Sequence, residues 1–249
     1  MLEYALTNVI MILNKNREGG SKMAKKKMSL AQKVNVLRAS VMGANDGIIS
    51  VAGIVIGVAA ATSNAYSILI SGLSGSLAGM ISMCMGEYVS VSTQKDSQKM
   101  AMISERQRLT DQYQQEFDYV QKKYEAQDID PQLAHQATSE LMKKDSLATA
   151  VQERYGFNPK EFTSPYAAAI ASFISFPTGS ILPMVAVTMA PAESRIWATM
   201  VAVLIALLIT GYFAAVLGKS NRVKSMFRNA AAGLLTMGVT FVIGQLFAR

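Results

Sequence analysis

Two acidic residues, Asp46 and Glu87, lie inside long apolar stretches of this 249-residue chain. A charged side chain at membrane depth is costly, about 2.5–3.5 kcal/mol for an aspartate at the centre of a transmembrane helix. Residues of this kind usually face the interior of a helix bundle and mark a path for ions or protons. The alternative is that both carboxylates lie close enough to the interface to reach water or to cap a helix end. We favour the ion path because of the residues beside Glu87.

Sulfur-containing side chains accompany Glu87 at helical spacing. Met80, then Met83 or Cys84, and then Glu87 follow one another at steps of three and four residues, so they share one face of a helix. A carboxylate stacked with thioethers combines hard and soft ligands, which suits Fe²⁺ or Mn²⁺ better than Mg²⁺ or Ca²⁺. Methionine is also an ordinary core residue, so Met80 and Met83 gain their weight from Glu87.

Other metal and redox chemistry is poorly supported. Cys84 is the only cysteine, which excludes an intrachain disulfide and a zinc site built from cysteines. The single histidine, His135, lies in a polar segment, where we expect a solvated helix residue rather than a metal ligand. We expect no cofactor and no enzyme activity, since no nucleophile is paired with a base and no phosphate-binding loop is present.

The elements that must position these residues are transmembrane helices. The chain is 51% hydrophobic and 16% charged, well below the charge of a soluble domain. A helix crosses a bilayer with about 20 apolar residues. Five segments meet that length: residues 40–62, 66–92, 166–190, 195–217 and 227–247.

Lysine and arginine placement predicts the orientation. Eight precede the first span, ten lie between spans two and three, and four lie between spans four and five. The positive-inside rule places these regions in the cytoplasm and the C-terminus outside. We expect the plasma membrane as the location. Tyr66 and Trp197 fall at the outer ends of their spans, where aromatic rings favour the interface. The net charge of +7 is therefore a topology signal and does not indicate nucleic-acid binding.

We therefore predict an all-α integral membrane protein with five transmembrane helices and a three-helix cytoplasmic insert between spans two and three. The predicted organisation is a cytoplasmic N-terminal segment (1–38), spans one and two (39–93), the insert (94–163) and spans three to five (164–249).

The insert is predicted to hold one amphipathic helix to about Gln127, a turn at residues 128–131 and two shorter helices that end near Gly156. A three-helix insert has little core of its own, which favours packing against a second copy of the chain.

The motifs around the two acids resemble the vacuolar iron transporter family of iron and manganese carriers, in its bacterial, nodulin-like branch. The resemblance rests on Leu37-Arg38-Ala39, on the run from Gly43 to Ser50, on the run from Ile81 to Ser90, and on Glu153 to Phe157. It implies a homodimer that moves Fe²⁺ or Mn²⁺ out of the cytosol in exchange for protons. In this resemblance Asp46 and Met83 match translocation residues of the family, and Glu87 matches the glutamate of its nodulin-like branch.

The insert departs from the pattern of that family, whose first insert helix carries Glu-x-x-Glu pairs that collect metal. Here Glu105 is followed by Arg108 and Glu116 by Tyr119, so each pair lacks one carboxylate. The remaining candidate ligands are Glu105, Glu116 and Glu153, with Glu140 as an additional one. Arg108, one turn from Glu105, could replace a metal charge with a salt bridge. The insert therefore either binds metal weakly or serves mainly in dimerisation.

Two other functions remain open from the sequence. Asp46 and Glu87 could form a proton relay in a transporter or channel for another small solute. Alternatively, the chain could be a membrane scaffold whose insert binds a partner. Sequence does not separate iron from manganese, because both accept the same ligands.

The first residues form a separate case. Residues 17–23 include Glu-Gly-Gly just before Met23, a sequence that a ribosome-binding stretch can encode. We hypothesise that residues 1–22 are a translated ribosome-binding region and that synthesis starts at Met23.

Overall fold

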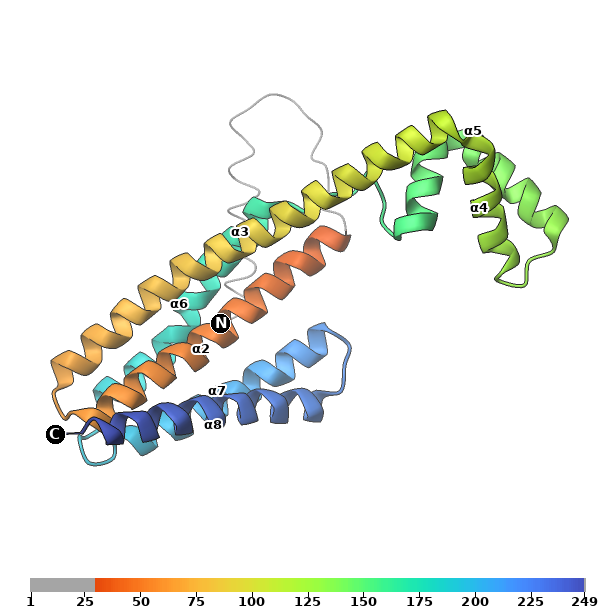
Figure 1. The fold of residues 1–249 in the computed structure, drawn as a ribbon. Helices are drawn as coiled ribbons and strands as arrows, with labels where there is room; N and C mark the ends of the chain where they lie inside the picture. The colour runs from red at the N-terminus through yellow and green to blue at the C-terminus, as the bar shows by residue number, and fades with distance from the viewer. Residues whose placement is uncertain (1–29, 249) are drawn as a thin grey trace, which may run out of the picture. The chain divides into compact units, whose positions relative to one another are not determined.

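The computed structural model describes residues 30–248, which form seven helices and no strand (Figure 1). Their bounds are α2 (Leu30–Ala61), α3 (Ala65–Asp111), α4 (Tyr113–Glu125), α5 (Pro131–Tyr155), α6 (Pro165–Met189), α7 (Arg195–Leu217) and α8 (Arg222–Leu246). The hypothesis about residues 1–22 lies outside the described residues.

Five of these helices, α2, α3, α6, α7 and α8, are long and apolar enough to cross a membrane. Their outward surfaces carry large apolar side chains, such as Leu77 and Ile81 on α3 and Leu235 and Val239 on α8. Exposed apolar surface of this extent is unfavourable in water and expected in lipid. The all-helical, multi-pass architecture predicted from the sequence is therefore confirmed.

The chain divides into two compact units. Of the described residues, 33–88 and 165–248 form the membrane unit, and 89–164 together with 30–32 form the insert unit. Helix α3 contributes to both, since it is continuous from Ala65 to Asp111.

Helix α2 is the packing centre of the membrane unit. Its residues Ile48, Ala52 and Ile56 form one buried cluster with Val203, Leu207 and Met237 of α7 and α8. On another face, Val51 and Val55 pack with Ile68 of α3 and with Phe176 and Val187 of α6. Four helices thus surround α2, and half of its most apolar window is buried, more than in any of the other four.

Glycines allow α2 and α6 to approach closely. A Cβ atom added at Gly47 would overlap the carbonyl oxygen of Phe176, and one added at Gly179 would overlap that of Ala44. Helix association in lipid depends on van der Waals packing, which small residues make possible. This contact therefore requires glycine on both helices.

The first helix of the insert unit differs from the sequence prediction, and the two shorter helices predicted after the turn form one kinked helix, α5. The helix expected to run to about Gln127 is interrupted at Gln112, where φ is −143° and ψ is 43°. The break separates α4 from α3 and lets α4 pack along α5, which buries Val120 and Glu116. Local periodicity does not reveal the break, because the apolar spacing continues through it.

Helix α5 has a clear beginning and end. The Asp130 side chain accepts hydrogen bonds from the backbone N–H groups of Gln132 and Leu133, with Pro131 at the first helical position. Gly156 ends the helix in the left-handed conformation, with φ of 73°. The helix is kinked at Asp145, where φ is −162° and ψ is 86°.

Candidate functional site: membrane carboxylates and insert carboxylates

Asp46 lies on the exposed face of α2 in the membrane unit. Its Oδ1 accepts a hydrogen bond of 2.7 Å from the Ser50 hydroxyl, one turn further along the helix. Arg38, Met42, Asp46 and Ser50 repeat at four-residue steps, so they form one stripe along α2. Met42 is 45% exposed and the Arg38 side chain is also 45% exposed, so the stripe is open along much of its length.

The opposite sides of α2 fix this orientation of Asp46. Asn45 turns toward α7 and α8, where its Oδ1 accepts hydrogen bonds of 3.2 Å from Thr210 and from Asn229. Ala44 and Gly47 turn toward α6. Successive helix residues are 100° apart, so these contacts leave Asp46 outside the packed core.

The hydrogen bonds of Asn45 were not anticipated from the sequence. The signal that could have revealed them is the presence of amide and hydroxyl side chains in three otherwise apolar spans, because polar groups within lipid usually bond across helices.

Glu87 is buried and paired with an arginine. Its side chain is 8% exposed, and its Oε2 lies 2.9 Å from Nη2 of Arg38. The same Arg38 nitrogen also donates to Oδ1 of Asn35 at 3.2 Å. A buried carboxylate needs a cationic or hydrogen-bonding partner, and Arg38 supplies it from the Asp46 stripe. Glu87 was predicted as a site residue from the sequence, whereas its pairing with Arg38 was not.

The two methionines of the predicted ligand set pack in the core. Met80 and Met83 are half-buried against the cluster of Val51, Val55 and Phe176, between α2, α3 and α6. They share a helix face with Glu87, as the spacing indicates, but in this structure their immediate contacts are apolar. Cys84 is a half-buried free thiol.

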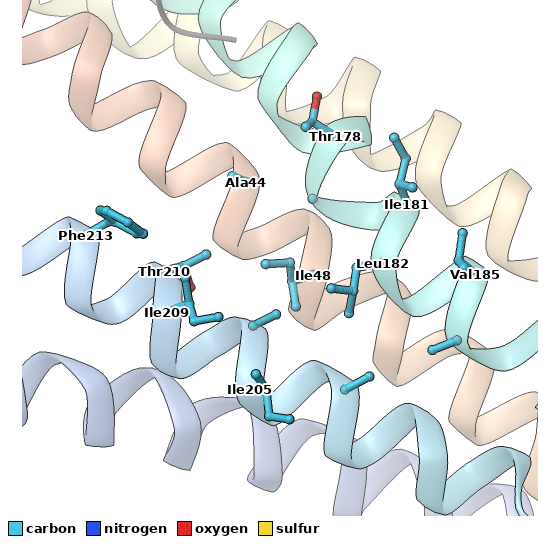
Figure 2. A pocket seen from close by; sticks show the side chains of 14 residues that line it. Ala44, Ile48, Thr178, Ile181, Leu182, Val185, Ile205, Ile209, Thr210 and Phe213 are labelled. Carbon is cyan, nitrogen blue, oxygen red and sulfur yellow. The ribbon is translucent and has the colours of Figure 1, made fainter. Parts of the chain in front are cut away.

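A groove of about 660 Å³ in the membrane unit lies between α2, α6 and α7 (Figure 2). Side chains such as Ile48, Leu182, Ile205 and Phe213 line it, and none of its fourteen lining residues is acidic or contains sulfur. The hydroxyls of Thr178 and Thr210 are its only polar side-chain groups, and a divalent cation needs a fuller set of charged or neutral ligands, so this groove does not suit one.

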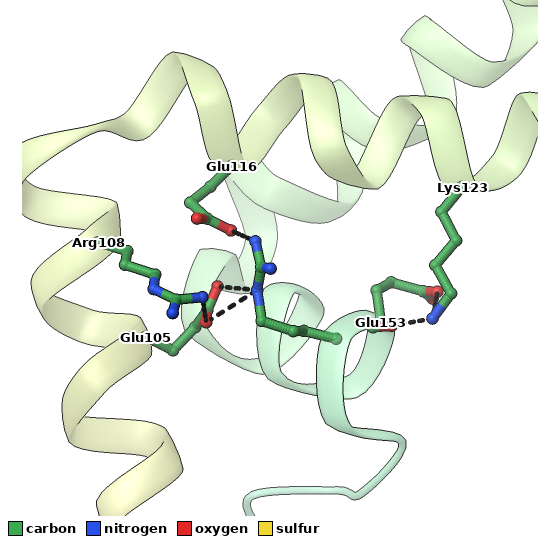
Figure 3. A network of polar contacts seen from close by, with 6 residues as sticks. Glu105, Arg108, Glu116, Lys123 and Glu153 are labelled. Carbon is green, nitrogen blue, oxygen red and sulfur yellow. Dashed lines mark hydrogen bonds and ion pairs between the residues drawn. The ribbon is translucent and has the colours of Figure 1, made fainter.

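The insert carboxylates form a separate charged network (Figure 3). Nε of Arg154 lies 3.2 Å from Oε2 of Glu105, and the same guanidinium donates through Nη2 to Glu116. Arg108 lies further from Glu105, at 3.8 Å. The sequence suggests Arg108 as the replacement cation, but Arg154 lies closer to Glu105 than Arg108 does.

Glu153 has two partners of its own. Nζ of Lys123 lies 3.6 Å from its Oε2, and the Tyr124 hydroxyl donates to its Oε1 at 3.0 Å. Burial and the bond to Glu153 raise the pKa of Tyr124 to about 12. Glu140 is exposed on α5, outside this network.

Two further polar residues have structural roles in the insert. His135 is exposed and packs edge-on against the Phe117 ring at 5.3 Å between centroids. The hydrogen bond from Lys160 holds the pKa of Asp145 below its usual value.

Among the described residues, no group of three or more His, Cys, Asp or Glu side chains is arranged to hold a metal ion.

Comparison with known proteins identifies the family. The model of the VIT family matches residues 37–245, which is most of the chain. The chain belongs to the VIT family. This confirms the resemblance found in the motifs around Asp46 and Glu87.

Several curated relatives are similar to this chain over about four fifths of their own length. "Vacuolar iron transporter" of Acanthamoeba castellanii is 33% identical over 84% of this chain and 78% of its own. "Vacuolar iron transporter homolog 2" of Arabidopsis thaliana is 32% identical over 84% of this chain and 83% of its own. "Vacuolar iron transporter homolog 5" of Oryza sativa is 32% identical, covering 88% of this chain and 84% of its own.

Proposed function

We propose that this protein carries divalent iron or manganese across a membrane and out of the cytosol, in exchange for protons. The observation that carries the proposal is the carboxylate of Asp46, exposed in the middle of an apolar helix on a stripe that also holds Arg38. Membership of the VIT family and the names of the relatives support a metal ion as the substrate.

The exposed stripe also supports a homodimer. An open carboxylate facing lipid is unfavourable, so the stripe requires either water or a second protein surface. A second copy placed against α2 would cover Asp46 and create a polar path between the subunits. The metal path would then be lined by Asp46 and Glu87 with thioethers from Met83 and Met80.

Competition between protons and metal supplies the coupling. Metal ligands must be deprotonated, so a carboxylate that gains a proton releases a bound cation. A proton entering from outside would release the metal there, and loss of that proton in the cytoplasm would restore the site. Metal loading is proposed on the cytoplasmic side. The positive-inside rule places there the beginning of span one, near Asp46, and the end of span two, near Glu87.

The proposed setting is the plasma membrane, with the N-terminus in the cytoplasm and the C-terminus outside. The proposed physiological role is control of metal levels and protection from excess metal.

A flux measurement tests the transport function and the role of the carboxylates. Liposomes that hold the purified protein and a metal-sensitive dye should take up Fe²⁺ or Mn²⁺. The uptake should be faster when the proton gradient is directed outward, because protons then leave as the metal enters. Asp46→Asn and Glu87→Gln should each lower the rate by at least about tenfold, equivalent to roughly 1.4 kcal/mol. Asp96→Asn is the matched control, since Asp96 is an exposed acid that pairs only with Lys99 nearby in α3.

The outcomes separate the competing functions. Equal flux in wild type and both membrane variants would reject the carboxylate path. Proton movement without metal flux would favour a transporter of another solute, and no flux of either kind would favour a scaffold.

A further inference from the structure

Arg154 occupies the position between insert carboxylates where a metal ion would otherwise neutralise them. Its guanidinium contacts Glu105 of α3 and Glu116 of α4, while Arg154 itself belongs to α5. One side chain thus joins all three helices of the insert unit (Figure 3). The two contacts span 49 and 38 residues of sequence, so this side chain fixes tertiary structure.

Burial makes this arrangement hard to exchange for a metal. The Glu105 side chain is fully buried, Glu116 is 6% exposed and Arg154 is 21% exposed. The guanidinium also lies over the Tyr119 ring, 3.9 Å from its centroid. A planar guanidinium that pairs with carboxylates and packs on an aromatic face is held by geometry as well as by charge.

The remaining acid of the cluster is also neutralised. Lys123 and Tyr124 satisfy Glu153, and Arg108 provides a second guanidinium near Glu105. A divalent ion would have to displace a partly buried arginine and leave that charge without its two carboxylate partners, which is unfavourable. The donor set of the insert therefore does not fit a divalent metal while Arg154 is in place.

We infer that Arg154 is a resident cation that replaces metal in the insert. The insert unit of this protein folds without a metal ion and does not load one on Glu105 and Glu116. This inference stands apart from the proposed transport function, because it concerns only the insert and is read from binding and stability, not from flux.

Metal binding to the full-length protein in detergent tests the inference. The parent for all variants carries Asp46→Asn and Glu87→Gln, which removes the proposed membrane ligands. The probe is Mn²⁺, followed by the loss of the free-ion electron paramagnetic resonance signal. Arg154→Gln should raise Mn²⁺ affinity by about tenfold or more over the parent and create about one site per chain, because the freed carboxylates then need a cation.

Controls assign the new site. Arg154→Lys keeps the charge and should bind Mn²⁺ as weakly as the parent. Arg106→Gln removes an exposed arginine of the same helix as Glu105 and should also match the parent. Adding Glu116→Gln to Arg154→Gln should abolish the gain.

Two results would overturn the inference. One is Mn²⁺ binding by the parent that Glu105→Gln or Glu116→Gln removes. The other is a folded Arg154→Gln variant that gains no Mn²⁺ binding. If Arg154→Gln does not fold, thermal unfolding of the parent, which lacks the proposed membrane ligands, decides: the same midpoint with chelator and with Mn²⁺ supports the inference, and a midpoint lowered by chelator overturns it.

Discussion

At the scale of single residues, Glu87 depends on Arg38 for charge balance. The carboxylate is almost fully buried and the guanidinium is half-exposed, with 2.9 Å between their atoms. Loss of the arginine leaves a buried charge without a partner, whereas loss of both charges leaves an uncharged contact.

Arg38→Gln should therefore destabilise the protein by about 1–3 kcal/mol. Adding Glu87→Gln should recover part of the loss, which a double-mutant cycle of thermal unfolding in detergent would measure. Strictly additive effects of the two substitutions on stability would contradict the pairing.

Tyr124 provides a pH-dependent contact in the insert. Its pKa is raised from 10.0 to about 12, first by burial and then by the bond to Glu153. A raised pKa means that the protonated phenol is favoured in the folded state. The stabilisation is therefore complete below pH 10 and is lost as the pH rises toward 12.

Tyr124→Phe should lower stability by about 1 kcal/mol at pH 8, because it removes a hydrogen bond to a carboxylate. The difference between wild type and variant should shrink between pH 10 and pH 12, as measured by thermal unfolding at each pH. A difference that stays constant over this range would show that the phenol proton does not contribute.

At the scale of elements, α2 organises the membrane unit through its small residues. Gly47 contacts the backbone of α6 at Phe176, and Gly57 contacts the backbone of α8 at Thr240. Because four neighbouring helices pack on different faces of α2, the rotation of this helix decides which side chain remains exposed. That exposed residue is Asp46.

Gly47→Ala should lower the thermal midpoint and cost about 1–3 kcal/mol, since the added methyl group would overlap a backbone oxygen that cannot move freely. Gly238→Ala is the matched control, because nothing lies within 4 Å of the added Cβ in this transmembrane helix. The control should be neutral or stabilising by up to about 1 kcal/mol through helix propensity. Equal effects of the two substitutions would contradict the close contact.

At the scale of the whole molecule, the placement of basic residues predicts the orientation in the membrane. The loops after α2 and α6 contain Ser63 and Ser194, and the loop after α7 contains Ser220. The positive-inside rule places the first two outside and the third in the cytoplasm.

Single cysteines in a Cys84→Ser background test this topology. Ser63→Cys and Ser194→Cys should react with a membrane-impermeant maleimide in intact cells, and Ser220→Cys should react only after permeabilisation. The reverse pattern would invert the topology and the proposed direction of transport.

The amino-acid sequence alone determined the helical class, the five apolar spans and the family. These features depend on local hydropathy and on short motifs around Asp46 and Glu87, so they can be predicted without knowledge of the tertiary contacts. It also identified the acids that the proposed function uses. The break at Gln112 was missed, because the spacing of apolar residues is the same on both sides of it.

Only the tertiary structure decided the partners of those acids. Glu87 pairs with Arg38, 49 residues away, and Glu105 is closer to Arg154 than to its sequence neighbour Arg108. Spacing within one helix predicts which side chains share a face, but not which distant helix meets that face. The packing of α2 against its neighbours exposes Asp46, and the packing of α4 and α5 places an arginine between the insert carboxylates.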